Sequence, residues 1–244
     1  MNGVSLADLT GSLRAKLGSA AAGWLDDALA AVASDARAVR TWFPAAARKV
    51  GTAPLDVRDH EGAAPWGADE AARAVMLVAL GTRVSQEIED LYRYGDAAER
   101  RAILRSLHLV PVGYAGTALV LDALRTNDER LVAASLGPYA VDHLDDNSFR
   151  HAVLKCVFMG LPLARIAGLD TRADAELARM LAAYAHERVA AGRDVPSDVW
   201  PLIDRFPPEA ELAALADELH ADADGRRRAA EAALAQHAAI RGRS

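Results

Sequence analysis

The chain has 244 residues, of which 52% are hydrophobic and only 5% aromatic, so alanine and leucine supply most of its apolar content. Its formal net charge of −6 argues against a nucleic-acid partner, because nucleic-acid-binding surfaces usually carry a basic patch. No run reaches the roughly 20 apolar residues of a membrane span. The N-terminus also lacks the apolar core of a secretory signal, so we expect a soluble and most simply cytoplasmic protein.

The N-terminal quarter is expected to contain helices followed by a long loop. Apolar residues recur there at three- and four-residue steps, which is the periodicity of amphipathic helices, and residues 1–50 fit two or three of them. Residues 51–68 include the stretch GTAPLDVRDHEGAAPWG, whose prolines and glycines predict a loop. A loop of this length is often functional or serves as a linker.

Helical periodicity resumes at residue 69 and continues to the C-terminus. Asp96, followed three residues later by Glu99, is typical of a capping box at the start of a helix. The expected helices are Asp69–Leu80, Val84–Tyr94, Asp96–His108, Ala115–Leu124, Asp128–Leu136, Asn147–Met159, Asp174–Ala191, Ser197–Phe206, Glu209–Ala221 and a charged tail helix ending in RGRS.

These elements predict an all-α fold. Alanine is the best helix former, and β-branched residues are sparse. About a dozen helices with short turns predict stacked antiparallel helix pairs, a HEAT-like α-solenoid, with residues 69–244 as a helical-repeat body in one continuous domain. A globular helical bundle is the alternative, because no fixed repeat period is visible. The single cysteine, Cys156, lies in an apolar run and is expected to be a buried, inert thiol.

The segment DHLDDNSFRH, residues 142–151, contains three carboxylates and two imidazoles, groups that bind divalent metals or perform acid–base chemistry. Capping of the following helix by Asp145, Asp146 or Asn147 is the simpler explanation. No established metal-binding spacing such as HExxH is present. We therefore expect no metal site and no cofactor, with a divalent metal as the alternative.

Five cationic or titratable side chains of the C-terminal half are candidates for binding an anionic ligand. They are Lys155, Arg165, Arg172, His186 and Arg188. If the helices that carry Lys155 and His186 belong to adjacent layers, these two side chains face the same side, with Arg165 or Arg172 at the rim. Such a positive pocket on an acidic protein would favour an anion. Structural roles are the alternative: solvent exposure for the lysine, salt bridges for the arginines, and a bond to a neighbouring helix for the histidine.

Residues 124–206 resemble the EboA family, whose members are described as acting in bacterial metabolite traffic. The resemblance rests on LRTND (124–128), VLKCVFMGLPLARIAGLDTRA (153–173), YAHERVAAGR (184–193) and VWPLIDRF (199–206). Family members usually have NPYP and then YFD before this region, where this chain has GPYA at 137–140 and HLD at 143–145. Contacts made by those aromatic residues are therefore expected to differ here.

The resemblance implies a helical-repeat fold and a role in exporting or processing a small specialised metabolite. It supplies no established catalytic mechanism, so we expect a protein that binds a small acidic metabolite or a partner protein of a biosynthetic pathway. The alternative is an enzyme of specialised metabolism, an isomerase, cyclase or hydrolase with or without a divalent metal. Its candidate catalytic residues are Asp142, His143, Asp145 and His186. The sequence predicts no oligomeric state.

Overall fold

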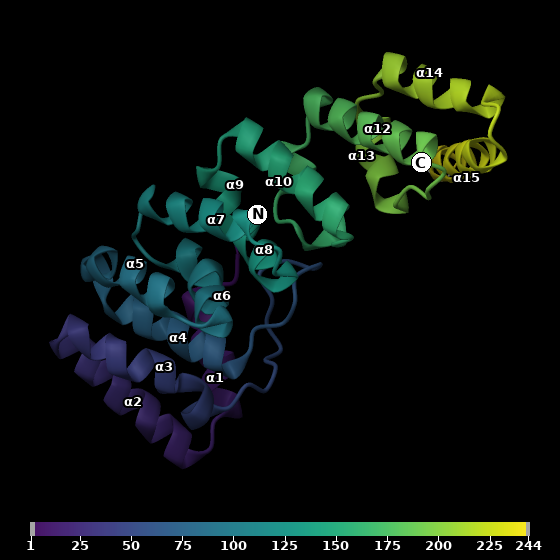
Figure 1. Cartoon of the computed structure of the whole chain (residues 1–244). Helices are drawn as coiled ribbons and strands as arrows, with labels where there is room; N and C mark the ends of the chain where they lie inside the picture. Colours follow the sequence, from purple (N-terminus) through teal and green to yellow (C-terminus); the bar gives the residue numbers. More distant parts are fainter. Residues whose placement is uncertain (1–2, 243–244) are drawn as a thin grey trace. The chain divides into compact units, whose positions relative to one another are not determined.

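The computed structural model describes residues 3–242, and within that range the chain contains helices and no strand (Figure 1). The all-α prediction is confirmed, whereas the HEAT-like stacking stays a prediction. The α-helices are α1 (Leu6–Lys16), α2 (Ser19–Ser34), α3 (Val39–Val50), α4 (Ala68–Ala79), α5 (Val84–Tyr94), α6 (Ala97–Ser106), α7 (Ala115–Arg125), α8 (Glu129–Ser135), α9 (Pro138–His143), α10 (Asp146–Met159), α11 (Leu169–Arg172), α12 (Ala175–Ala190), α13 (Trp200–Arg205), α14 (Glu209–Asp217) and α15 (Asp224–Arg241). The last two residues of the predicted tail helix lie outside the described residues.

The chain divides into two compact units. Unit 1 contains the residues up to Asp145 together with Ala164–Gly168, and unit 2 contains Asp146–Leu163 and the residues from Leu169 onward. No helix in the described range is both long and apolar enough to cross a membrane.

Helix α4 forms the centre of unit 1, where α1, α2, α3 and α6 pack against it (Figure 1). Its residues from Ala68 to Leu77 are all buried, and the many alanines among them let neighbouring helices approach from several sides. Arg73 on this helix forms a buried ion pair with Asp69 and donates a hydrogen bond to the Phe43 carbonyl (3.2 Å). Outward from α4, α6 packs against α8, and α5 packs against α6 and α7.

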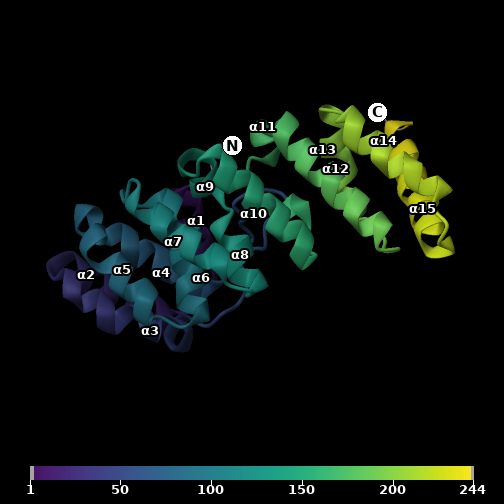
Figure 2. The same cartoon turned by 45° about the horizontal axis from the view of Figure 1, so that its top comes forward.

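Unit 2 is built around α12, which contacts α10, α13, α14 and α15 (Figure 2). Asp174 caps this helix by accepting a hydrogen bond from the Leu177 amide (2.9 Å), and Arg150 forms an ion pair with the same carboxylate. The Arg150 guanidinium lowers the pKa of Asp174. Cys156 on α10 is buried as expected, and burial raises the pKa of its thiol to about 12.

The segment between α3 and α4 contains no helix, but backbone hydrogen bonds join its two halves. The Leu55 amide donates to the Trp66 carbonyl (2.7 Å), and the Trp66 amide donates to the Val57 carbonyl (3.0 Å). Trp66 is fully buried, so the end of this segment is part of the core of unit 1. We call residues 51–67 the strap, because Leu55 near its start and Trp66 at its end are buried in the core of unit 1.

Gly62 of the strap lies directly against the Ala164 carbonyl. A Cβ atom at position 62 would come within 1.8 Å of that oxygen, so we expect Gly62→Ala to displace the strap and to destabilise unit 1 by roughly 1–3 kcal/mol. Urea unfolding followed by circular dichroism measures the change. Gly23→Ala is the matched control, since nothing lies within 4 Å of a Cβ there, and we expect it to stabilise helix α2 by about 0.5–1 kcal/mol. Equal stability of the two variants would contradict the close approach.

Candidate anion-binding site

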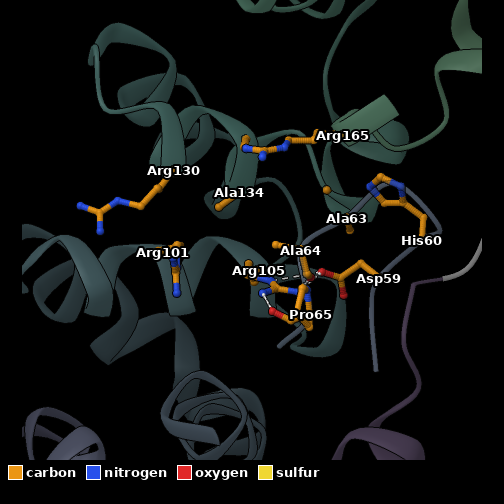
Figure 3. Close-up of a pocket in the computed structure, with 12 residues that line it drawn as sticks. Asp59, His60, Ala63, Ala64, Pro65, Arg101, Arg105, Arg130, Ala134 and Arg165 are labelled. Carbon is orange, nitrogen blue, oxygen red and sulfur yellow. Dashed lines mark hydrogen bonds and ion pairs between the residues drawn. The ribbon is translucent and has the colours of Figure 1, made fainter. Parts of the chain in front are cut away.

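A cavity of about 130 Å³ lies in unit 1 between the strap, α6, α8 and the segment Ala164–Gly168 (Figure 3). Its titratable and charged lining residues are Asp59, His60, Arg101, Arg105, Arg130 and Arg165, and the rest of the lining is small. Four arginines therefore line the cavity with a single aspartate, on a protein whose net charge is negative. The volume is below the roughly 300 Å³ at which sites for larger ligands begin, so the cavity suits a small anionic group.

Helix α6 supplies two of the four arginines. Arg101 and Arg105 are four residues apart and so lie on one face of the helix. The start of α6 is fixed by the predicted capping box, in which the Glu99 amide donates to Asp96 (2.8 Å) and the Asp96 amide donates to Glu99 (3.0 Å). The cap sets where the helix begins, and the four-residue spacing places both arginines on the face that lines the cavity.

Arg105 holds the strap rather than a ligand. Its side chain is 8% exposed, and its guanidinium lies 4.2 Å from the centre of the Trp66 ring. All five of its N–H groups have protein acceptors: the Asp59 carboxylate (2.9 and 3.2 Å), the Glu70 carboxylate (2.9 Å) and the carbonyls of Ala64 (3.0 Å) and Pro65 (3.1 Å). No N–H is left for another acceptor.

Glu70 belongs to the same network and pairs with both arginines of α6. Its side chain is 1% exposed, and one carboxylate oxygen accepts from Arg101 Nε (2.5 Å) while the other accepts from Arg105 (2.9 Å) and the Gly67 amide (2.9 Å). The buried carboxylate is thus paired with two cations. Arg101 keeps its two terminal nitrogens outside this ion pair, because only its Nε takes part in it.

Arg130 and Arg165 have guanidinium groups that the protein leaves accessible. The Arg130 side chain is 68% exposed, with only a 3.6 Å contact to Asp128. Arg165 is exposed, and among residues 3–242 its side chain has no ion-pair partner. Guanidinium groups bind carboxylate and phosphate in bidentate fashion, so an anion here competes at most with the long, exposed contact between Arg130 and Asp128.

His60 closes the cavity beside Arg165. Burial lowers the pKa of His60 below its ordinary value of 6.5, and Arg105 lowers it further, against the opposing effects of Asp59 and of a hydrogen bond with the Arg165 backbone. The imidazole is therefore neutral at neutral pH and links the strap to the Arg165 segment.

The lowered pKa of His60 predicts how stability depends on pH. Because the folded state disfavours the protonated imidazole, the contribution of His60 is present above pH 6.5 and is lost as the pH falls through the folded-state pKa. We expect the wild-type chain to lose more stability than His60→Gln when the pH is lowered from about 7.5 to about 5. Urea unfolding at both pH values measures this difference, and identical losses in the two proteins would contradict the prediction.

Of the five ligand-binding residues predicted from the sequence, Arg165 lines this cavity and the other four belong to unit 2. Lys155 is half-buried on α10. The other three have protein partners: Arg172 binds Asp146 (2.7 Å), His186 binds Glu218 (3.2 Å), and Arg188 donates to the Asp194 carbonyl (2.9 Å). The predicted convergence of Lys155, His186 and the arginines stays a prediction.

The four candidate catalytic residues are also divided between the units. Asp142 and Asp145 are exposed, and His143 stacks on Tyr139, with ring centres 4.0 Å apart, while His186 belongs to unit 2. Within residues 3–242, no three His, Cys, Asp or Glu side chains are grouped as a metal ion would require. Asp146 lies in the first turn of α10 and pairs with Arg172.

Sequence reasoning missed Asp59, His60, Arg101, Arg105 and Arg130. Two features of the sequence pointed toward these residues. The strap was noted as a long loop of a kind that is often functional, and it contributes Asp59 and His60. The four-residue spacing of Arg101 and Arg105 on a capped helix indicated a cationic face, but not what would cover it.

The fold and this cavity together define an all-helical protein with a small, arginine-rich cavity under a strap. A family model described as "Metabolite traffic protein EboA" matches residues 6–204. The chain therefore belongs to the EboA family, as the resemblance in its C-terminal half predicted. All residues that line the cavity lie within the matched range. No match was found among curated proteins or among solved structures.

Proposed function

We propose that the protein binds the carboxylate or phosphate group of a small metabolite in the cavity of unit 1, and that this binding is its part in metabolite traffic. The observation that carries the proposal is the difference in how far protein acceptors already occupy the arginines of the cavity. Arg105 is saturated by protein acceptors, whereas Arg130 has only an exposed, 3.6 Å ion pair with Asp128 and Arg165 has no ion-pair partner among the described residues, and both line the cavity.

The pinned strap supports the same conclusion. An anion gains most from cations that are already in place, because less conformational entropy is lost on binding. Arg105, Glu70 and Asp59 fix the wall of the cavity before a ligand arrives. The cavity admits a small group, so the remainder of a larger metabolite, or of an acidic pathway partner, would extend outward past Arg130.

Isothermal titration with glycerol 1-phosphate, inorganic phosphate and citrate tests the proposal, with neutral glycerol as the matched control. We expect saturable binding of at least one anion, no binding of glycerol, and weaker binding as salt is raised, since exposed charges are screened. If none of the anions binds at low salt, or if glycerol binds equally well, the proposal is wrong.

A further inference from the structure

A second cavity of unit 1, about 500 Å³ in volume, lies along the facing sides of α5 and α7. It shares no lining residue with the arginine-rich cavity. On α5 the lining residues include Ile88 and Tyr92, and on α7 they include Ala115 and Leu119, each pair four residues apart. Each helix therefore presents one continuous face, and the volume falls within the range of small-molecule sites.

The floor of this groove is apolar. Ile88 and Leu119 are buried, and Ala115 and Ala118 of α7 line the groove beside them. Contact with this floor would remove apolar surface of a ligand from water, which is favourable in proportion to the area covered.

The Tyr92 hydroxyl is an unsatisfied polar group in the groove. Tyr92 is only 4% exposed, and its buried hydroxyl oxygen makes no hydrogen bond of regular geometry within the described chain. Burial, the charge of the nearby Asp122 carboxylate and a contact of the hydroxyl with that carboxylate raise the pKa of Tyr92 to about 12, so the hydroxyl keeps its proton and remains a donor. Its contact with Asp122 falls outside regular hydrogen-bond geometry, and buried polar groups are nearly always hydrogen-bonded, so a better-placed acceptor on a ligand can take up this donor.

The lining of the groove contains three arginines and two carboxylates. Arg93, Arg100 and Arg125 line the groove, together with Glu89 and Asp122. Arg100 is held by the carbonyls of Gly95 (3.0 Å) and Arg93 (3.0 Å). The side chains of Arg93 and Arg125 are exposed, and among the described residues neither has an ion-pair partner.

We infer that this groove is a second binding site, for an amphiphilic small molecule with an apolar body and a carboxylate. The apolar body would cover Ile88 and Leu119. The carboxylate would accept hydrogen bonds from the Tyr92 hydroxyl and from the guanidinium groups of Arg93 or Arg125. The groove shares no lining residue with the first cavity and has a larger volume, and the inference does not rest on the proposed function.

Calorimetric titration with octanoate tests the second site, with octylammonium as a probe of equal chain length and opposite charge. We expect octanoate to bind saturably and octylammonium to bind much more weakly. The double variant Arg93→Gln/Arg125→Gln should weaken octanoate at least ~10-fold, and Tyr92→Phe about 5-fold, since each removes hydrogen bonds to a charged group.

Arg48→Gln is the matched control, because Arg48 is an exposed arginine of unit 1 that lines neither cavity. It should leave octanoate binding unchanged, and melting curves of all variants establish that they fold. The inference is overturned if octanoate does not bind, if octylammonium binds equally well, or if the groove variants bind like the wild type. Loss of octanoate binding in Arg130→Gln/Arg165→Gln instead would place the ligand in the first cavity and would also overturn it.

Discussion

Replacing Arg105 with methionine is expected to destabilise the protein by about 3–5 kcal/mol, because it leaves buried charges without their partner. Glu70 would keep only Arg101, and Asp59 would lose its guanidinium contacts entirely. The carbonyls of Ala64 and Pro65 would lose donors as well. Methionine fills a similar volume, so the loss reports the charge network rather than a void. Urea unfolding monitored by circular dichroism gives the change in the free energy of unfolding.

Two further variants test whether the loss of stability comes from this ion-pair network or would follow any substitution on α6. Arg101→Met should cost less than Arg105→Met, because Arg101 is a third exposed and Glu70 would still be paired with Arg105. Adding Asp59→Asn and Glu70→Gln to Arg105→Met should recover part of the stability, since the unpaired charges are then removed. A free energy of unfolding for Arg105→Met within about 1 kcal/mol of the wild type would show that Arg105 does not hold the strap.

The double variant Arg130→Gln/Arg165→Gln should show the opposite behaviour: a large loss of binding with little loss of stability. A hydrogen bond to a charged group contributes about 1.5–3 kcal/mol, so each substitution should weaken glycerol 1-phosphate about 10- to 100-fold. Both side chains are exposed, and Arg130 has only its distant Asp128 contact, so the free energy of unfolding should change by less than about 0.5 kcal/mol.

Arg48→Gln serves again as the control for the loss of one positive charge. It should leave glycerol 1-phosphate binding nearly unchanged at moderate salt, because Arg48 does not line the cavity. If Arg48→Gln weakens binding as much as Arg130→Gln or Arg165→Gln alone, the anion responds to the overall charge of the protein rather than to this site.

Helix positions were predictable where a side chain caps the first turn. Asp96, Asp128 and Asp174 each accept a hydrogen bond from the start of the helix that the sequence placed after them. The short helices α9 and α11 were missed, because six and four residues are too few for a hydrophobic period to show. α9 also begins at Pro138, which reads as a turn residue although proline is favoured at the first helical position.

The candidate site was less predictable, because its members meet only through tertiary packing. Arg165 was among the predicted ligand-binding residues, but Arg101 and Asp59 are separated by more than 40 residues, and no local pattern joins them. Conversely, Arg172 and His186 looked available in the sequence, and their acidic partners, Asp146 and Glu218, lie 26 and 32 residues away. Long-range ion pairs decide which arginines are free, and spacing along the chain does not reveal them.

The most direct test of the anion-binding site is a titration with glycerol 1-phosphate followed by the NMR signals of the arginine Nε–Hε groups, assigned by single Arg→Gln variants. The Nε–Hε group of Arg165 and that of Arg130 should shift saturably, with one common dissociation constant. The signal of Arg105, whose donors are already occupied, should move much less. Saturable shifts of Arg172 and Arg188 with Arg130 and Arg165 unmoved would contradict the assignment and would place the anion in unit 2.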